Sequence, residues 1–273
     1  MQIKLLDAFT FVRHLVRRWD VVALIVVIAL LTFFAEASQG VLEPLNNLES
    51  TPLSLDPVHL PFYAARTTAR MFTGLSFSLL FTLTYATWAA KSPRAEKLLI
   101  PILDILQSVP IIGFMSVTLV FFMSLAPGRV LGVEFASIFL VFTSQAWNMA
   151  FSFYQSLRTV PIELRNAADS FGVRGLLWWR RVAIPAVFPY FVTGAITASG
   201  GSWNAAYVAE VINWKSTEIK AHGIGAYLAE ATTAGDFHRI LLGISVMCLF
   251  VVTINRIFWR PLYYYAERKF RIS

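Results

Sequence analysis

A small set of polar side chains interrupts the long apolar runs of this 273-residue chain. Polar groups within hydrocarbon are costly unless they face a bundle interior or water, so such a set predicts either a polar pathway or hydrogen bonds between helices. Because no Lys or Arg lies deep in a run, we do not expect a fixed charge to capture an anion there. The candidate pathway residues are Gln107, Ser108, Gln145, Asn148, Ser199, Trp203, Asn204 and Glu210.

No combination of residues predicts catalysis or metal binding. No paired acid and base lies at one depth of the runs, and the single cysteine, Cys248, lies within a hydrophobic run. The histidines are His14, His59, His222 and His238, and they lack the spacing of metal ligands. No Gly-Lys dipeptide occurs, which excludes a Walker A loop for nucleotide phosphates. We therefore expect no catalytic residue, metal or cofactor in this chain.

A charged segment, residues 156–186, separates two of the apolar runs and includes five arginines. Thr159 is placed to cap a short helix with Pro161 in its first turn and Glu163 near the positive end of its dipole. Gly172 supplies a left-handed stop for this helix. Between them, Leu164, Ala167, Ala168 and Phe171 recur at helical spacing and form an apolar stripe.

We expect a second short helix at residues 176–182, after which Pro185 and Pro189 turn the chain back into the bilayer. Small alanines allow another protein to approach closely, and arginines can pair with its acidic side chains. The segment is therefore either a docking site for a partner or an amphipathic helix that lies on lipid headgroups.

The composition, with 57% hydrophobic and 14% charged residues, predicts an all-α integral membrane protein. Apolar runs that approach or exceed the length needed to cross about 30 Å of hydrocarbon predict about six transmembrane helices in one domain, residues 1–273. Pro110 should break the third run into helical pieces at 98–108 and 111–126. The runs are residues 21–35, 68–90, 98–126, 133–154, 187–212 and 240–259.

The distribution of basic residues predicts the orientation of the chain. Of the 23 Lys and Arg, 17 fall on the side of the N-terminus and 6 on the other, so both termini and residues 156–186 should be cytoplasmic. The proline-rich residues 36–66 then form an irregular outer loop with a short surface helix near its end. This loop is either solvated or in contact with an extracytoplasmic partner. The first run also resembles a secretory signal, but we favour a retained span because six spans keep both termini on one side.

The run N-A-A-D-S-F-G, followed after nine residues by V-A-I-P, resembles the EAA loop of permease subunits in binding-protein-dependent ABC importers. Asn166 stands in place of the family's Glu, and the match falls on Ala167, Ala168, Gly172, Val182, Ile184 and Pro185. Residues 200–212 and 103–114 resemble the nitrate, sulfonate, taurine and bicarbonate permease group. The resemblance implies a type I importer permease fold in a bacterial inner membrane.

It also implies the partners. Two cytoplasmic ATPase subunits, which bind ATP and Mg²⁺, would clasp the EAA helices of two permease subunits, identical or different. An extracytoplasmic solute-binding protein would deliver a small anion such as nitrate, bicarbonate, sulfonate or taurine. In this chain the resemblance assigns ATPase coupling to Glu163, Leu164, Ala167, Ala168, Phe171, Gly172 and Pro185.

Three other functions make different demands on the sequence. A secondary transporter would place a protonatable or sodium-binding group at mid-span, where this chain has amides and hydroxyls. A permease for a vitamin precursor would look similar to an anion permease. A protein that binds nucleic acid would gather its basic residues in one domain, whereas the residues behind the net charge of +7 punctuate the spans, so we expect contact with lipid and none with nucleic acid.

Overall fold

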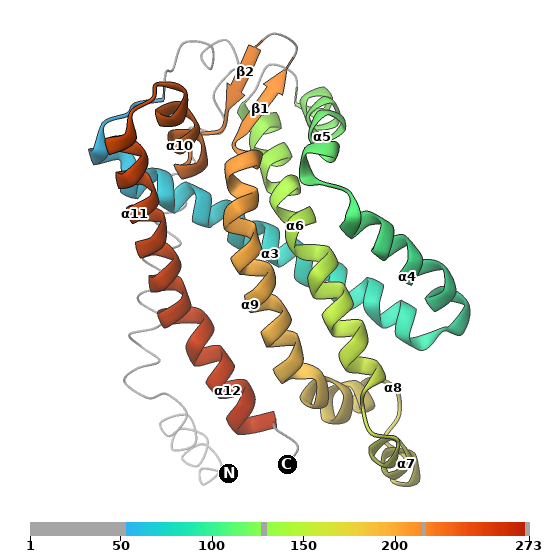
Figure 1. Cartoon of the computed structure of the whole chain (residues 1–273). Coiled ribbons are helices and arrows are strands. Elements are labelled where there is room, and N and C mark those ends of the chain that lie inside the picture. Colours follow the sequence, from blue (N-terminus) through green and yellow to red (C-terminus); the bar gives the residue numbers. More distant parts are fainter. Residues whose placement is uncertain (1–52, 127–129, 215–216, 271–273) are drawn as a thin grey trace, which may run out of the picture. The chain divides into compact units, whose positions relative to one another are not determined.

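The computed structural model describes residues 53–126, 130–214 and 217–270. Within these ranges the chain is helical except for one two-stranded hairpin (Figure 1). The predicted first span at 21–35 lies outside the described residues, as does most of the predicted outer loop 36–66. The end of that segment is helical, as expected, but the helix is not a separate surface helix, because a 3₁₀ turn, η3 (Pro57–His59), leads directly into a long helix.

That helix, α3 (Leu60–Lys91), begins about two turns before the predicted span 68–90. Its first turns are buried by other helices although they include Arg66 and Arg70. Hydropathy misplaced this boundary because the arginines, which look like loop residues, are paired with acids inside the protein.

Two shorter helices, α4 (Pro93–Ser108) and α5 (Ile111–Leu125), follow α3. Ser92 caps α4 by accepting a hydrogen bond from the backbone N–H of Ala95 at 3.3 Å, and Pro93 occupies the first turn. Val109 and Pro110 are extended between the helices, so the break predicted at Pro110 is confirmed.

The helix α6 (Val130–Arg158) packs between α3 and α9 (Ile184–Ala209), with α5 against its first half (Figure 1). Glycines let these helices approach closely. A Cβ added at Gly74 of α3 would lie 3.2 Å from the backbone nitrogen of Phe142, and one at Gly194 of α9 would lie 2.7 Å from the Cβ of Ser152. The absence of a side chain at these two positions therefore lets α3 and α9 pack closely on α6.

The charged segment after α6 contains α7 (Ile162–Ser170) and α8 (Gly175–Trp178). A π-helical turn, η4 (Trp179–Ala183), connects α8 directly to α9. The predicted turn at Pro185 and Pro189 is therefore wrong, because the helix continues through both prolines. A proline has no backbone N–H to donate to the preceding turn. A π turn changes the hydrogen-bond pattern at that point, so the chain stays helical.

After α9 the chain forms the hairpin β1 (Val211–Trp214) and β2 (Thr217–Lys220), antiparallel with Val211 opposite Lys220. The short helix α10 (Ile224–Thr233) follows. The last helices are α11 (Phe237–Ile254) and α12 (Arg260–Phe270), which a second π turn, η5 (Asn255–Trp259), joins just before Pro261.

Within the described residues, three continuous helical stretches are long and apolar enough to cross a membrane. They are Val130–Arg158, Gly175–Ala209 and Phe237–Phe270. The most apolar part of the first is 61% buried in the protein and that of the third is 6% buried. The last stretch therefore leaves nearly all of its surface for lipid or other protein.

Candidate functional site

The short helices α7 and α10 lie toward opposite ends of the helix stack (Figure 1). We call the end with α7, α8 and the C-terminal turn of α12 the α7 end. The end with the hairpin, α10 and the first turn of α11 is the α10 end. The two ends use different chemistry, since the α7 end is basic and aromatic while the α10 end contains a closed ion cluster.

At the α7 end, α7 forms a short exposed helix. Its N-cap is Pro161, and Thr159 donates a hydrogen bond to the carbonyl of Ser156, so the predicted Thr159 cap is absent. Glu163 lies in the first turn and is exposed. The predicted apolar stripe is split between two faces: Leu164 and Ala168 face inward, whereas Ala167 and Phe171 are exposed, Phe171 to 84%.

Gly172 ends α7 in the left-handed region predicted from the sequence, with φ of +67°. The backbone N–H of Val173 donates to the carbonyl of Ala168 at 2.8 Å, which closes the helix end. Among the described residues, no atom lies within 4 Å of a Cβ built at Gly172, so this stop is open to that distance. Pro185, the last residue of the motif, lies in the first turn of α9.

At the α10 end, four charged side chains form a buried cluster from three helices. Arg70 of α3 donates to Glu134 of α6 through Nε at 2.5 Å and Nη2 at 2.6 Å, and its Nη1 donates to Glu210 at 2.6 Å. Arg66 donates to Glu134 at 2.6 Å. The formal charges of the cluster sum to zero, as burial requires.

Glu210 also fixes the start of α10. Its Oε2 accepts from the backbone N–H groups of Gly225 at 2.7 Å and Ala226 at 3.3 Å. Thr67 donates to its Oε1 at 2.5 Å and accepts from the N–H of Ile224 at 2.9 Å. A carboxylate at a helix N-terminus satisfies unpaired N–H groups and the helix dipole. The cluster therefore connects α3, α6, α9 and α10 into one unit.

Glu210 was predicted from the sequence as a pathway residue, yet it is only 1% exposed. Arg66, Arg70 and Glu134 were not predicted at all. The available signal was weak: two arginines four residues apart at the start of one span, and an acid at the start of another.

The other predicted pathway residues fall into two groups. Gln145, Ser199 and Trp203 are buried, and the first two make hydrogen bonds between helices. Gln145 donates to the carbonyl of Met71 at 3.3 Å, and Trp259 donates to Ser199 at 3.1 Å. The exposed group is Gln107, Ser108, Asn148 and Asn204.

Asn204 belongs to a continuous exposed face of α9 made of small and polar residues, which are Thr193, Thr197, Gly200, Gly201, Asn204 and Tyr207. Gly200 and Gly201 have no atom within 4 Å of an added Cβ, so they do not serve packing within the described chain. The exposed face of α11 is mainly apolar by contrast, with Leu241, Leu249 and Val252, and its exposed Ser245 and Thr253 bond to carbonyls of their own helix. The face of α9 is therefore suited to water or protein, and that of α11 to lipid.

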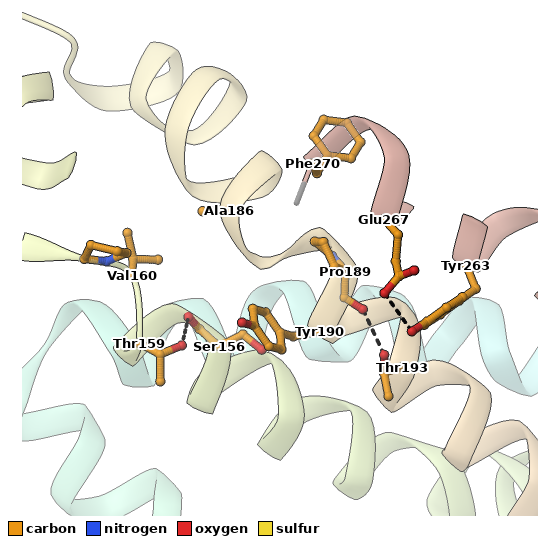
Figure 2. Close-up of a pocket in the computed structure, with 11 residues that line it drawn as sticks. Ser156, Thr159, Val160, Ala186, Pro189, Tyr190, Thr193, Tyr263, Glu267 and Phe270 are labelled. Atoms are coloured by element: carbon orange, nitrogen blue, oxygen red, sulfur yellow. Dashed lines mark hydrogen bonds between the residues drawn. The ribbon is translucent and has the colours of Figure 1, made fainter. Parts of the chain in front are cut away.

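At the α7 end this face of α9 meets a cavity of about 440 Å³ between α6, α9 and α12 (Figure 2). Thr193 belongs to both the face and the cavity. Tyr263 and Glu267 both line the cavity, and the Tyr263 hydroxyl donates a hydrogen bond to the Glu267 carboxylate at 2.9 Å. The other lining residues are Ser156, Thr159, Val160, Pro161, Ala186, Pro189, Tyr190 and Phe270.

Asp104 is exposed and accepts a hydrogen bond from Gln107 at 2.9 Å, one turn along α4. In the ranges that the structure describes, no group of His, Cys, Asp and Glu side chains could hold a metal ion.

These features define a polytopic helical membrane protein with a protruding basic loop at one end and a polar face along a central span. Residues 59–272 match the family model described as binding-protein-dependent transport system inner membrane component, and the chain belongs to this family. It is thus a permease of the type I ABC importer class, as its EAA-like motif predicted.

Among curated relatives, the chain is similar to the nitrate import permease protein NrtB of Leptolyngbya laminosa, with 26% identity over 57% of this chain and 50% of that protein. It is 23% identical to the bicarbonate transport system permease protein CmpB of Synechococcus elongatus, over 52% of this chain and 49% of that protein. The chain thus spans about half the length of these relatives. The NrtB of Synechocystis is 22% identical over 83% of this chain and 81% of its own length.

A solved structure of an amino acid ABC transporter with histidines has a similar fold. Its TM-score is 0.57 at 13% sequence identity, and the match covers 83% of this chain and 98% of that chain. The predicted all-α membrane fold is therefore confirmed, with the small hairpin β1–β2 as an addition.

Proposed function

We propose that this chain forms the solute pathway of an ATP-driven importer and that α7 couples it to separate ATPase subunits. The observation that carries the proposal is α7 itself. It is an exposed helix that protrudes beyond the ends of α6 and α9, with Phe171 84% exposed and an open left-handed stop at Gly172. Large exposed apolar side chains next to open backbone favour a protein partner.

The α7 end is then cytoplasmic, and the α10 end faces an extracytoplasmic solute-binding protein. The basic residues support this orientation, since Lys91, Arg158 and Arg165 lie at the α7 end. ATP and Mg²⁺ would bind the ATPase chains. Closure of those chains would move α7, and the helices fused to it would follow.

The exposed face of α9 is the proposed pathway wall, shared with a second permease subunit. Exposed amides and hydroxyls on a membrane span require water or protein beside them. Asn148, Asn204, Gln107 and Ser108 are the pathway residues best supported by their exposure. Gln145, Ser199, Trp203 and Glu210 would act by holding the wall in place.

A small anion such as nitrate, bicarbonate, sulfonate or taurine is the proposed solute class. The nitrate relative that matches over 83% of this chain supports it. The betaine permease ProW of Escherichia coli, a relative for a zwitterion, is 27% identical but matches over 47% of this chain and 34% of its own length. The neutral wall of α9 implies that selectivity resides mainly in the binding protein.

The test of coupling is Gly172→Arg in the assembled transporter. The variant should insert normally and lose ATP turnover stimulated by the binding protein, because the bulky charge lies on the docking surface and the φ of +67° is strained for any side chain. Gly235→Arg is a matched control. Gly235 has the same φ of +67° and the same open surroundings but lies at the α10 end.

Because Gly235 lies on the side proposed to face the binding protein, the two variants are compared by co-purification of the ATPase subunits. Loss of these subunits in both variants would indicate general damage and count against coupling through α7. Normal stimulated turnover in Gly172→Arg would reject it outright. A substrate screen with purified binding protein, comparing nitrate, bicarbonate, sulfonates and betaine by calorimetry, tests the solute class separately.

A further inference from the structure

A basic cavity lies between α7 and the ends of the spans, and the function proposed above does not use it. It has a volume of about 350 Å³, and its polar lining consists of Lys91, Arg158, Arg165, Trp178 and Trp179. An adjoining cavity of about 400 Å³ shares all of these except Arg158 and adds Arg174 and Asp169. The first cavity thus has three cations and no acid in its wall.

The local acids neutralise only one of these three cations, Arg158. Glu96 pairs with Arg158 at 3.1 Å and also accepts from Tyr154, and Asp169 pairs with Arg174 at 3.6 Å. Among the described residues, neither Lys91 nor Arg165 pairs with a carboxylate. A cavity with two uncompensated cations attracts an anion.

The geometry positions both cations toward the cavity. Arg165 donates through Nη2 to the carbonyl of Leu157 at 2.8 Å, which ties the guanidinium to the end of α6. Lys91 Nζ lies 4.9 Å from the ring centroid of Trp179, a cation–π contact. Trp178 and Trp179 meet edge to face at 5.2 Å.

The surroundings of the cavity are those of a membrane interface. Trp178, Trp179 and Leu157 belong to the hydrophobic cluster that closes the α7 end of the stack. Trp88, one turn before Lys91, is 62% exposed, and Leu177, beside Trp178, is 44% exposed. Tryptophans with basic residues at the end of apolar spans mark the headgroup level.

We propose that this cavity binds the phosphate of an anionic phospholipid, with Lys91 and Arg165 as the principal ligands and Arg158 at the rim. Trp88 and Leu177 provide apolar surface for the acyl chains. The site is distinct from the proposed ATPase contact, because Phe171 and Ala167 are exposed on α7 and do not line the cavity. A lipid there would connect α7 to the ends of α3 and α6.

The test is native mass spectrometry of the assembled transporter, released from vesicles that contain phosphatidylglycerol and phosphatidylcholine in equal amounts. The wild type should retain phosphatidylglycerol in preference. Lys91→Ala with Arg165→Ala should weaken retention about twenty-five-fold, since each basic residue near an anionic surface contributes about fivefold. Arg260→Ala with Arg268→Ala is the control, which removes two exposed charges from α12 outside the cavity and should retain the lipid.

Three results would overturn the proposal. One is equal retention by the double variant and the wild type. Another is loss of the ATPase subunits with unchanged lipid, which would assign the cavity to a protein contact. The third is displacement of the lipid preference by inorganic phosphate alone, which would indicate a site for a soluble anion. If the double variant does not assemble, each single variant should show about a fivefold loss, and Lys91→Arg should retain the lipid.

Discussion

Arg70 and Glu134 form a two-point ion pair between α3 and α6, with Nε and Nη2 of the arginine donating to the two carboxylate oxygens at 2.5 and 2.6 Å. The residues are 64 positions apart in the sequence, and both are nearly inaccessible. The remaining donor nitrogen of Arg70 donates to Glu210, so a single guanidinium connects two acids from different helices. The stability of the α10 end depends on this side chain.

Arg70→Met should therefore destabilise the chain severely. The substitution leaves two buried carboxylates with one arginine, Arg66, and breaking a buried pair costs about 3–5 kcal/mol. Denaturant titration in mixed micelles should show a loss of that size. Arg70→Lys should lose part of it, because an ammonium cannot make both bonds of the fork.

The exposed pair of Arg239 and Asp236, with side chains 41% and 31% accessible, provides the comparison. Arg239→Ala should change stability by no more than about 1 kcal/mol. An equal effect of the two arginine substitutions would show that the cluster does not hold the α10 end together.

The seating of α10 on α9 should be sensitive to a single methyl group. A Cβ at Gly225 would lie 2.7 Å from the Cα of Tyr207 and 2.8 Å from the carbonyl oxygen of Ala206, both backbone atoms that cannot rotate away. Gly225→Ala should cost about 1–3 kcal/mol in the same titration. Gly200→Ala should cost nothing, since its surroundings are open.

Two glycines of α9 should separate packing from transport. Gly194→Leu would collide with Ser152 of α6, 2.7 Å from the added Cβ, and should lower the unfolding temperature. A Cβ added at Gly200 has no atom of the described residues within 4 Å, so Gly200→Leu should leave that temperature unchanged. It should nevertheless reduce solute uptake by reconstituted transporter, because the leucine projects from the proposed pathway wall. Full uptake with Gly200→Leu would place the pathway elsewhere.

Gln145 and Asn148 should behave oppositely although they are one turn apart on α6. Gln145 is 1% exposed and bonds to Met71 and Ser78 of α3 at 3.3 Å, so Gln145→Leu should cost about 1 kcal/mol of stability. Asn148→Leu should leave stability unchanged and alter uptake per folded transporter. Thermal unfolding and vesicle uptake, measured on both variants, check the pair. Matching profiles for the two would mean that their difference in exposure has no functional meaning.

The comparison of sequence and structure shows what local pattern can predict. The left-handed stop at Gly172 and the break at Pro110 follow from backbone constraints of the residues themselves, and both are present. The Thr159 cap failed because its hydroxyl bonds to Ser156 of the preceding helix instead. The turn at Pro185 failed because a proline can remain in a helix if a π turn precedes it.

The ion cluster could not be predicted from the local sequence pattern, for a different reason. Its members come from three helices that contact one another only in the folded stack. Without that contact, the charges of Arg66 and Arg70 predict a loop. Similarly, Gln145 and Asn148 share a chemical type and a spacing of three residues, and only the position of α3 buries one of them. The motif at Ala167 and Gly172 is enough to predict the class of protein. The side chains that hold the helices together could not be predicted from the sequence.

The two π turns have a consequence for helical register. Each adds the equivalent of one residue to its helix, and one residue corresponds to a rotation of about 100° around the axis. A stripe of side chains on α8 therefore does not continue along the same side of α9, and α11 and α12 are offset in the same way. A regular helical repeat that is extended across Trp179–Ala183 or Asn255–Trp259 would therefore place the wrong residues on a given face of the helix.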